Sequence, residues 1–304
     1  MPRIARLKSN DSIFHVMVRS ISEIQLFKEN EDKDRYLDLI KKHTKKFGFK
    51  VYAYCLMDNH GHLIIDSNGA DISKIMHGIN FSYAGYFNRK YKRHGHVFQD
   101  RFKSKIIDSE KYLITLSAYI HSNPTDIKKY KKKPQKYKYS TLNLYLGLKK
   151  DSKDIVDAKY VMSLFSNKVN KAREQYLQFV LGYKNEEINM EVEFTNEETE
   201  YRSERVIHKR DYTPNDIVKY VAAYTKIEEK KIYIKYNKEA TISRALVALL
   251  MKRFCNFAHK DICKVIGNIT SSRISSLCTM AVEIVMGNSR YNKIIDDFIW
   301  REVV

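Results

Sequence analysis

The sequence has no run of about 18 consecutive apolar residues, the length that a membrane-spanning helix requires. Its first residues, MPRIARLKSND, lack the apolar segment of a signal peptide. The four cysteines form no C-x-x-C pair, and three of them fall within apolar helical patterns. A zinc site or a disulfide framework is therefore not expected. We expect a soluble cytoplasmic protein that keeps its thiols reduced and does not bind membranes.

Acidic side chains are outnumbered, with 36 Asp and Glu against 55 Lys and Arg, which leaves a net charge of +19. Such an excess favours a polyanionic partner such as nucleic acid, and hence association with the nucleoid. The alternative is a basic protein from a lysine-rich proteome. The chain has 304 residues, 43% of them hydrophobic, which is enough for about two domains with real cores.

The first 150 residues carry alternating patterns of strand and helix. Runs rich in β-branched and aromatic residues predict strands at 13–19, 51–57, 62–66 and 102–107. Apolar residues at helical spacing predict amphipathic helices at 31–47, 72–91 and 109–122. The order β-α-β-β-α-β followed by a helix is that of a ferredoxin-like α+β domain, an antiparallel sheet with helices on one face.

The rest of the chain divides into three parts. We expect a helical extension over residues 151–183, with short helices near 153–165 and 168–181. Residues 184–212 are rich in glutamate without clear periodicity, which predicts an exposed acidic linker. Residues 213–304 are expected to form a separate all-α domain.

Apolar residues at helical spacing predict five helices in this all-α domain, at 217–224, 228–236, 243–254, 259–266 and 271–286. The last two flank Gly267 and resemble a helix-turn-helix. The second helix of the pair begins with Ser271, Ser272 and Arg273, which can contact phosphates and base edges of double-stranded DNA. An ordinary pair of antiparallel helices is the alternative.

A basic segment follows the third helix of the first domain. Seven lysines lie between Lys128 and Lys138, interleaved with Tyr130 and Tyr137. Lysines such as Lys131 and Lys132, mixed with aromatic rings, suit the backbone and bases of single-stranded DNA. A solvated loop is the alternative.

Two histidines stand at spacing two, His60 and His62, and point to the same face of an expected strand. Neutral imidazoles are common ligands of divalent metals. Tyr119 and Asn123 lie four apart on one face of the third helix, and an amide oxygen suits Mg²⁺ or Mn²⁺. If this helix packs on the strand, the four residues form a metal site with a tyrosine beside it. A solvated strand end is the alternative.

Such a site supports phosphodiester transesterification. The metal would polarise the oxygens of the scissile phosphate. Tyr119 would attack phosphorus, become linked to the 5′ end and free a 3′ hydroxyl. Because a tyrosine has an unperturbed pKa near 10, it needs help from the metal or from a nearby base.

Five segments in a fixed order carry a resemblance to a known family: 14–19, 53–63, 86–91, 95–104 and 119–124. Over roughly residues 10–147 the chain resembles the HUH single-tyrosine transposases, closest to the REP-associated group of the insertion-sequence-200 type. The resemblance implies that His60, His62 and Asn123 hold Mg²⁺ or Mn²⁺ and that Tyr119 is the nucleophile. It also implies single-stranded DNA, often near a hairpin, as the substrate.

The chain departs from this family pattern at a few positions. Gly61 stands where the family has a bulky apolar residue, which removes a core contact and predicts a looser metal geometry. The family's Asn-Pro-Val-Arg is Asn-Pro-Thr-Asp here, over residues 123–126. Arg19, Arg101 and Lys103 are candidates for phosphate contacts, with a plain surface role as the alternative. His121 lies off the Tyr119 face and receives no role.

The all-α domain resembles the C-terminal DNA-binding domain of the DnaA-type replication initiator. Residues 216–221 and the helix pair around 262–274 carry the likeness, which implies binding to double-stranded DNA. Residues 269–273, Ile-Thr-Ser-Ser-Arg, replace the Asp-His-Ser/Thr run of that family. Thr213 is expected to cap the first helix, with Asp216 near its third position.

The sequence thus predicts a metal-dependent single-stranded DNA transesterase of transposase type, monomeric or homodimeric, with an appended DNA-binding module. A domesticated DNA-binding regulator without catalysis is the second hypothesis. An RNA-binding protein is the third, although the central strands lack the expected aromatic motif.

Overall fold

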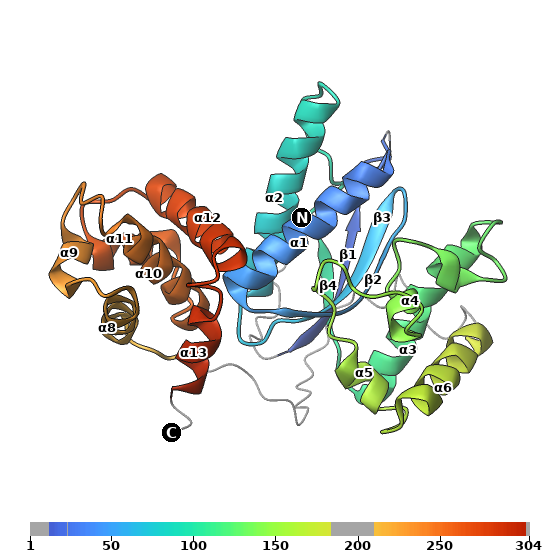
Figure 1. Ribbon diagram of the computed structural model, residues 1–304. Helices are drawn as coiled ribbons and strands as arrows, with labels where there is room; N and C mark the ends of the chain where they lie inside the picture. The colour runs from blue at the N-terminus through green and yellow to red at the C-terminus, as the bar shows by residue number, and fades with distance from the viewer. Residues whose placement is uncertain (1–11, 23, 184–209, 302–304) are drawn as a thin grey trace. The chain divides into compact units, whose positions relative to one another are not determined.

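The computed structural model describes residues 12–22, 24–183 and 210–301. Most of the expected acidic linker, residues 184–209, lies outside the described residues. The chain forms two compact units, one of residues 1–44 and 49–206 and one of residues 45–48 and 207–304. Figure 1 shows the sheet-containing first unit and the helical second unit. None of the described helices is long and apolar enough to span a membrane.

A four-stranded antiparallel sheet forms the centre of the first unit. Its strands run in the order β2-β3-β1-β4, namely Lys50–Leu56, His60–Asp66, Ile13–Arg19 and Lys103–Ile106. This is the sheet that the βαββαβ order predicts. The third strand begins at His60 rather than at residue 62, because His60 and Gly61 pair with Arg19 and Val18 of β1.

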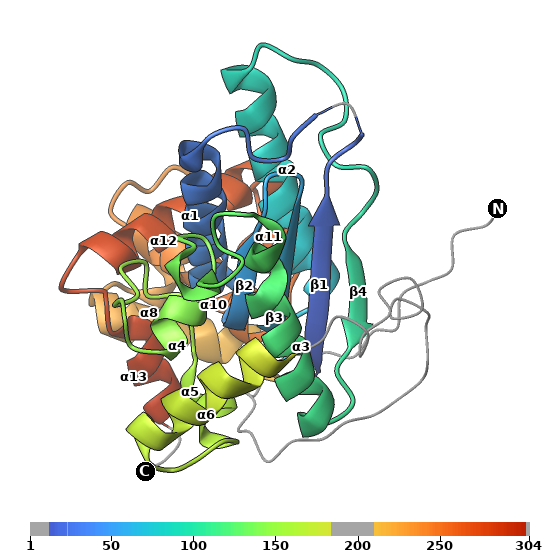
Figure 2. The ribbon, with the colours of Figure 1, turned by 90° about the vertical axis from the view of Figure 1, so that its right-hand side faces the viewer.

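Three helices cover the two faces of this sheet. α1 (Asn30–Phe47) and α2 (Ile72–Lys90) lie together on one face, while α3 (Glu110–Ser122) lies on the other. Figure 2 shows α3 in front of the sheet and α2 behind it. Asp71 caps α2 and Ser109 caps α3 through their side chains. The expectation that all helices share one face is therefore wrong for α3.

The chain that follows α3 packs back on the first unit as short elements. They are η1 (Asn123–Asp126), η2 (Pro134–Lys136), α4 (Leu142–Tyr145), α5 (Lys159–Ser163) and α6 (Val169–Gly182). The helix expected near 153–165 is shorter than predicted. The carboxylate of Asp151 accepts hydrogen bonds from the backbone N–H groups of Ile155 and Val156, and Val156 pairs with Val51. This part of the chain is therefore held outside a helix.

His121 has a structural role that the sequence did not reveal. It is fully buried, and its ring nitrogens lie within hydrogen-bond distance of the Tyr176 hydroxyl on α6 and of Thr141 Oγ1 (2.7 Å for the latter). It therefore ties α3 to α6 and to the segment before α4.

The described part of the second unit is all-helical. Its elements are α8 (Pro214–Thr225), α9 (Glu229–Tyr233), α10 (Thr241–Phe254), α11 (His259–Ile266), α12 (Ser271–Gly287) and α13 (Ile294–Trp300). Thr213 and Asp216 form the expected capping box. α10 is buried along most of its length and forms the centre of the core. α13, which adds Phe298 to that core, was not expected.

Candidate active site

The two histidines of β3 lie on one face of the sheet, in register with β1. His62 is opposite Met17 and His60 is opposite Arg19. His62 is buried and His60 is half-buried, and their ring centroids are 5.2 Å apart. The strand therefore presents both imidazoles side by side, as the spacing predicts.

α3 brings the other two predicted site residues to this pair. The ring of Tyr119 meets the ring of His62 edge-on, with centroids 5.5 Å apart. Asn123 Oδ1 lies 3.5 Å from His60 Nε2. Because α3 covers the face that carries the histidines, all four side chains converge. Their catalytic and metal-binding roles stay predictions.

The hydrogen bonds around His60 leave two acceptors facing each other. Asn59 Oδ1 lies 2.6 Å from His60 Nδ1, and an amide oxygen only accepts, so Nδ1 carries the proton and Nε2 a lone pair. Asn123 Nδ2 donates to the backbone oxygen of Tyr119 at 2.9 Å, which turns Asn123 Oδ1 toward His60. Two lone pairs directed at each other are suited to hold a cation between them.

A third histidine, His15, contacts the site from β1. It is fully buried, and its Nε2 lies 3.0 Å from His62 Nδ1. A proton donated by His62 Nδ1 leaves His62 Nε2 unprotonated, the state in which histidine binds metals. In the sequence, His15 was only one residue of the segment 14–19 that resembles the family. A lone histidine in an apolar strand indicates a role at the site only when the register of β1 and β3 is known.

Both strand histidines are held in the neutral form. Burial lowers the pKa of His62 well below its ordinary value, and the nearby rings of His15 and His60 lower it further. Burial also lowers the pKa of His60, although the nearby Asn123 oxygen, which would accept from the protonated ring, opposes this shift. Both rings are therefore neutral near pH 7, as metal coordination requires.

The site of His60 and His62 provides three ligands for a divalent metal only if the side-chain amide oxygen of Asn123 also binds the ion. In the described part of the chain, no group of three or more His, Cys, Asp or Glu side chains is placed to hold a metal ion. His60 Nε2 and Asn123 Oδ1 converge, and the ring of His62 adjoins that of His60. The residues present thus offer two imidazoles and one hard oxygen, with positions left for substrate oxygens.

Gly61 is packed more tightly than the sequence suggested. A methyl group added at this residue would lie 3.0 Å from Leu56 Cδ2 and 3.3 Å from Val18 Cγ2. These two side chains come from its partners in the neighbouring strands. The expected loss of a core contact is therefore wrong, because Leu56 and Val18 occupy the space.

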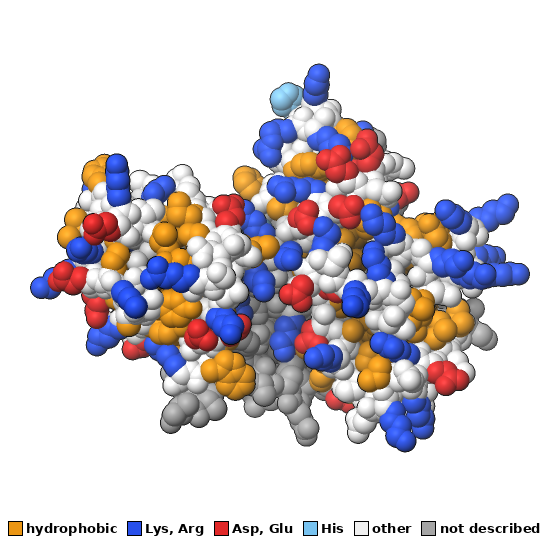
Figure 3. Space-filling view, in the orientation of Figure 1, with side chains coloured by type: hydrophobic (Ala, Val, Ile, Leu, Met, Phe, Trp, Pro, Cys, Tyr) orange, Lys and Arg blue, Asp and Glu red, His pale blue; other side chains and the backbone are white. Residues whose placement is uncertain are grey.

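The predicted phosphate contacts of the first unit are spread around the site. Arg19 is exposed at the end of β1, opposite His60, and Lys103 is exposed at the start of β4. Arg101 is also exposed and lines a cavity beside α2. Lys131 and Lys132 are exposed between η1 and η2, where basic side chains gather at the right of Figure 3.

One aromatic ring of the basic segment is not available to stack on bases. Tyr137 is buried, and its hydroxyl donates to the backbone oxygen of Leu56 at 2.7 Å. The ring of Tyr130 packs edge-on against it, with centroids 5.1 Å apart. The expectation that the lysines alternate with rings open to bases is therefore wrong for Tyr137.

The predicted contacts of the second unit lie at the start of α12. Ser271, Ser272 and Arg273 are exposed, and Thr270 caps the helix by accepting from the N–H of Arg273. Arg273 and Arg244 line a cavity of about 520 Å³ that has no acidic residue in its wall. The pair α11 and α12 has the expected positions, and its binding to DNA stays a prediction.

Comparison with known proteins finds a similarity over part of the first unit. Residues 8–123 match the family described as IS200-like transposases. This range contains all of the residues that converge at the site. A solved structure, that of a REP-associated tyrosine transposase bound to a REP hairpin, covers 52% of this chain and 94% of its own chain, with 19% identity and a TM-score of 0.42. No curated protein matches the chain.

Proposed function

We propose that the first unit cleaves and rejoins single-stranded DNA through a covalent bond to Tyr119. The observation that carries this proposal is the convergence of Tyr119 and Asn123 on the histidine pair of β3. The match of residues 8–123 to IS200-like transposases supports the same chemistry. A hairpin is the proposed form of the DNA, in keeping with the resemblance to the REP-associated group.

Each group at the site has a part in this reaction. The Tyr119 hydroxyl attacks the scissile phosphorus and loses its proton to water. A new bond joins the Tyr119 oxygen to phosphorus, while the bond from phosphorus to the 3′ oxygen breaks and that oxygen takes up a proton. The reverse reaction, with another 3′ hydroxyl, joins strands. Because the phosphodiester bond is exchanged rather than hydrolysed, no external energy source is required.

His60, His62 and Asn123 would hold Mg²⁺ or Mn²⁺. When bound, the cation would draw charge from the non-bridging phosphate oxygens. Asn59 and His15 keep the two imidazoles in fixed orientations. Arg19, exposed at the same end of the sheet, would bind a flanking phosphate.

The test is incubation of the full chain with end-labelled hairpin DNA and Mg²⁺ or Mn²⁺, followed by denaturing electrophoresis. We expect a covalent adduct that EDTA prevents and that Tyr119→Phe and His60→Ala abolish. Tyr183→Phe is the matched control, because its ring centroid lies only 6.3 Å from that of Tyr119. An adduct that survives Tyr119→Phe, or no adduct with the wild-type chain, would overturn the proposal.

The second unit is proposed to bind double-stranded DNA through the start of α12. The exposed Ser271, Ser272 and Arg273, beside a cavity that holds a second arginine, support this role. Arg273→Ala should weaken binding to a mixed-sequence duplex and reduce its salt dependence by about one phosphate contact. Lys293→Ala changes a lysine outside this cavity and is the control.

A further inference from the structure

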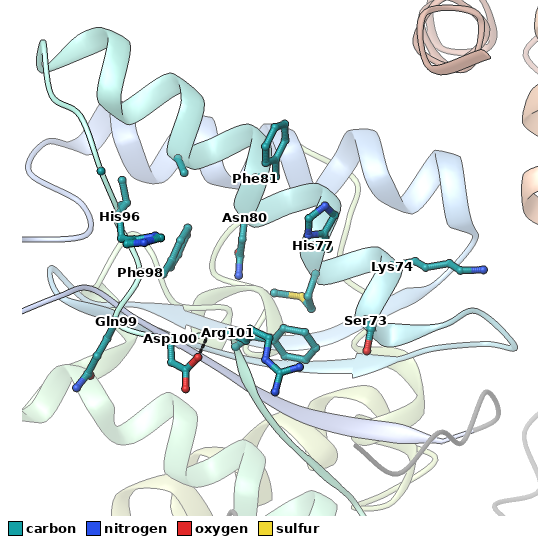
Figure 4. A pocket seen from close by; sticks show the side chains of 15 residues that line it. Ser73, Lys74, His77, Asn80, Phe81, His96, Phe98, Gln99, Asp100 and Arg101 are labelled. Atoms are coloured by element: carbon teal, nitrogen blue, oxygen red, sulfur yellow. Dashed lines mark hydrogen bonds between the residues drawn. The ribbon is translucent and has the colours of Figure 1, made fainter. Parts of the chain in front are cut away.

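A cavity of about 860 Å³ lies between α2 and residues 95–102, on the sheet face opposite α3. This volume is within the range of roughly 300–1,000 Å³ that small-ligand sites have. Figure 4 shows its wall, with Asn80 and His77 on α2 and with Phe98, Gln99 and Arg101 on the facing segment. None of these side chains takes part in the reaction proposed above.

The cavity combines apolar surfaces with an exposed ring. Phe98 and the buried Phe102 and Met76 contribute to its lining. Phe81 stands at its border with 73% of its surface exposed, and His77, one helical turn earlier, stacks on it with centroids 5.8 Å apart. An exposed aromatic ring held by a stacked neighbour is a platform for another flat ring.

The polar groups around the cavity are mainly donors. Asn80 Oδ1 accepts from the Tyr36 hydroxyl at 2.9 Å, so the amide N–H₂ is the part directed into the cavity, as Figure 4 shows. Arg101 and Lys74 add positive charge. The acid that lines the cavity, Asp100, accepts from the backbone N–H of Arg101 at 2.6 Å. A flat ring with carbonyl oxygens, attached to a phosphate, matches this wall.

The wall of the cavity is connected to the candidate active site through the sheet. The N–H of Gln99 donates to the backbone oxygen of Arg19 at 3.0 Å, and Phe98 pairs with Ser20. Arg19 is in turn the partner of His60. Residues 97–99 thus lie two strand spacings, about 10 Å, from the strand that carries His60. A DNA strand that left the proposed active site past Arg19 would reach Gln99, which is bonded to the Arg19 backbone, before other parts of this wall.

We infer that this cavity binds an unpaired base of the single-stranded DNA. Phe81 stacks on the base, Asn80 donates to its edge, and Arg101 binds the adjoining phosphate. This inference rests on the proposed function for the identity of the strand. It adds a second point of attachment, on the far face of the sheet, to the attachment at Tyr119.

The test uses a Tyr119→Phe background in EDTA, so that binding is measured without strand cleavage. The probes are a fluorescent oligothymidylate and an abasic oligomer of the same length, which carries the same phosphates. We expect the first to bind more tightly, and Phe81→Ala to weaken its binding roughly 5- to 150-fold, the equivalent of about 1–3 kcal/mol of stacking. Binding of the abasic oligomer should not change.

Two further variants separate stacking from a general loss of structure. Phe81→Trp should retain the preference for the base-bearing probe. Leu148→Ala, which changes a residue of the same unit that is 66% exposed and outside the cavity, should leave both affinities unchanged. A photoreactive 5-iodouracil in the oligomer should crosslink to the peptide that contains His77 and Phe81.

Equal affinity for the two probes, or a crosslink elsewhere, would overturn the inference. Displacement of the oligomer by thymidine monophosphate at equal affinity would also overturn it, because the ligand would then be a free nucleotide. The adduct assay runs in parallel with the wild-type chain. An adduct without base-dependent binding contradicts only the cavity, and base-dependent binding without an adduct contradicts only the transesterase.

Discussion

His15 Nε2 and His62 Nδ1 lie 3.0 Å apart between two central strands, in a part of the sheet where both side chains are buried. One of the two rings must donate to the other. A donor at His62 Nδ1 leaves the Nε2 of His62 with its lone pair. We therefore expect His15 to orient His62, the predicted metal ligand, without contacting the substrate.

His15→Phe keeps the shape of the ring and removes the acceptor. We expect Mn²⁺ affinity to fall by roughly 10- to 100-fold, the usual cost of losing a partner of a metal ligand. Titration of the full chain with Mn²⁺ followed by electron paramagnetic resonance measures this change.

His15→Gln is the matched variant, because it restores an acceptor and should recover part of the Mn²⁺ affinity. A purely structural role for His15 would make thermal stability change while Mn²⁺ affinity in the folded protein stays constant. That result would contradict the positioning role.

Asn123 is the predicted third metal ligand, so Asn123→Ala should reduce Mn²⁺ affinity by at least the roughly 10- to 100-fold that losing an outer partner of a ligand costs. Asn123→Asp should bind the ion at least as tightly as the wild type, because a carboxylate is also a hard ligand. Isothermal titration measures both. The control is Asn143→Ala, since Asn143 is equally buried, with 8% of its surface exposed, and lies in α4. Unchanged affinity in Asn123→Ala would contradict the ligand role.

The strands and long helices of the first unit could be predicted because their signals are local. A run rich in β-branched and aromatic residues marks β1, and helical spacing with a following break marks α1 and α3. The face of the sheet that each helix covers could not be predicted from local sequence patterns. α3 lies opposite α1 and α2, which depends on how the chain leaves β4. α5 is shorter than predicted because the Asp151 carboxylate, which lies before the helical pattern, accepts from the backbone N–H groups of Ile155 and Val156.

The candidate site was predictable where residues share one element. His60 and His62 share a strand, and Tyr119 and Asn123 share a helical stretch. Their meeting across the sheet depended on packing, and the contribution of His15 depended on register. The order of the family motifs along the chain predicted that the two pairs of residues meet. It did not predict the contact between His15 and His62.

Gly61 allows a test of packing between the two histidines of β3. Gly61→Ala should change the free energy of unfolding by less than about 1 kcal/mol, because the end of the Leu56 side chain can shift. Gly61→Leu should destabilise the first unit by roughly 1–3 kcal/mol through overpacking against Leu56 and Val18. Urea unfolding followed by circular dichroism measures both. The double variant Gly61→Leu, Leu56→Ala should recover part of the loss, and no recovery would contradict this account of the space.

His121 makes the stability of α3 depend on pH. Burial lowers its pKa to about 3, whereas in the unfolded chain it is near the ordinary value of about 6.5. His121 therefore binds a proton below about pH 6.5 in the unfolded state, but only below about pH 3 in the folded state. Stability is highest above this range and falls with decreasing pH by up to about 1.4 kcal/mol per pH unit.

His121→Gln keeps a polar side chain between Tyr176 and Thr141 and does not titrate. Between roughly pH 7.5 and pH 5, the wild type should lose about 2 kcal/mol more opening free energy than this variant. Hydrogen exchange of the amides of α3 and α6, corrected for the intrinsic effect of pH, measures the difference locally. His62 and His60 titrate with the same sign in both proteins, so the comparison isolates His121. Equal pH dependence in the two proteins would show that His121 already carries a proton in the folded state.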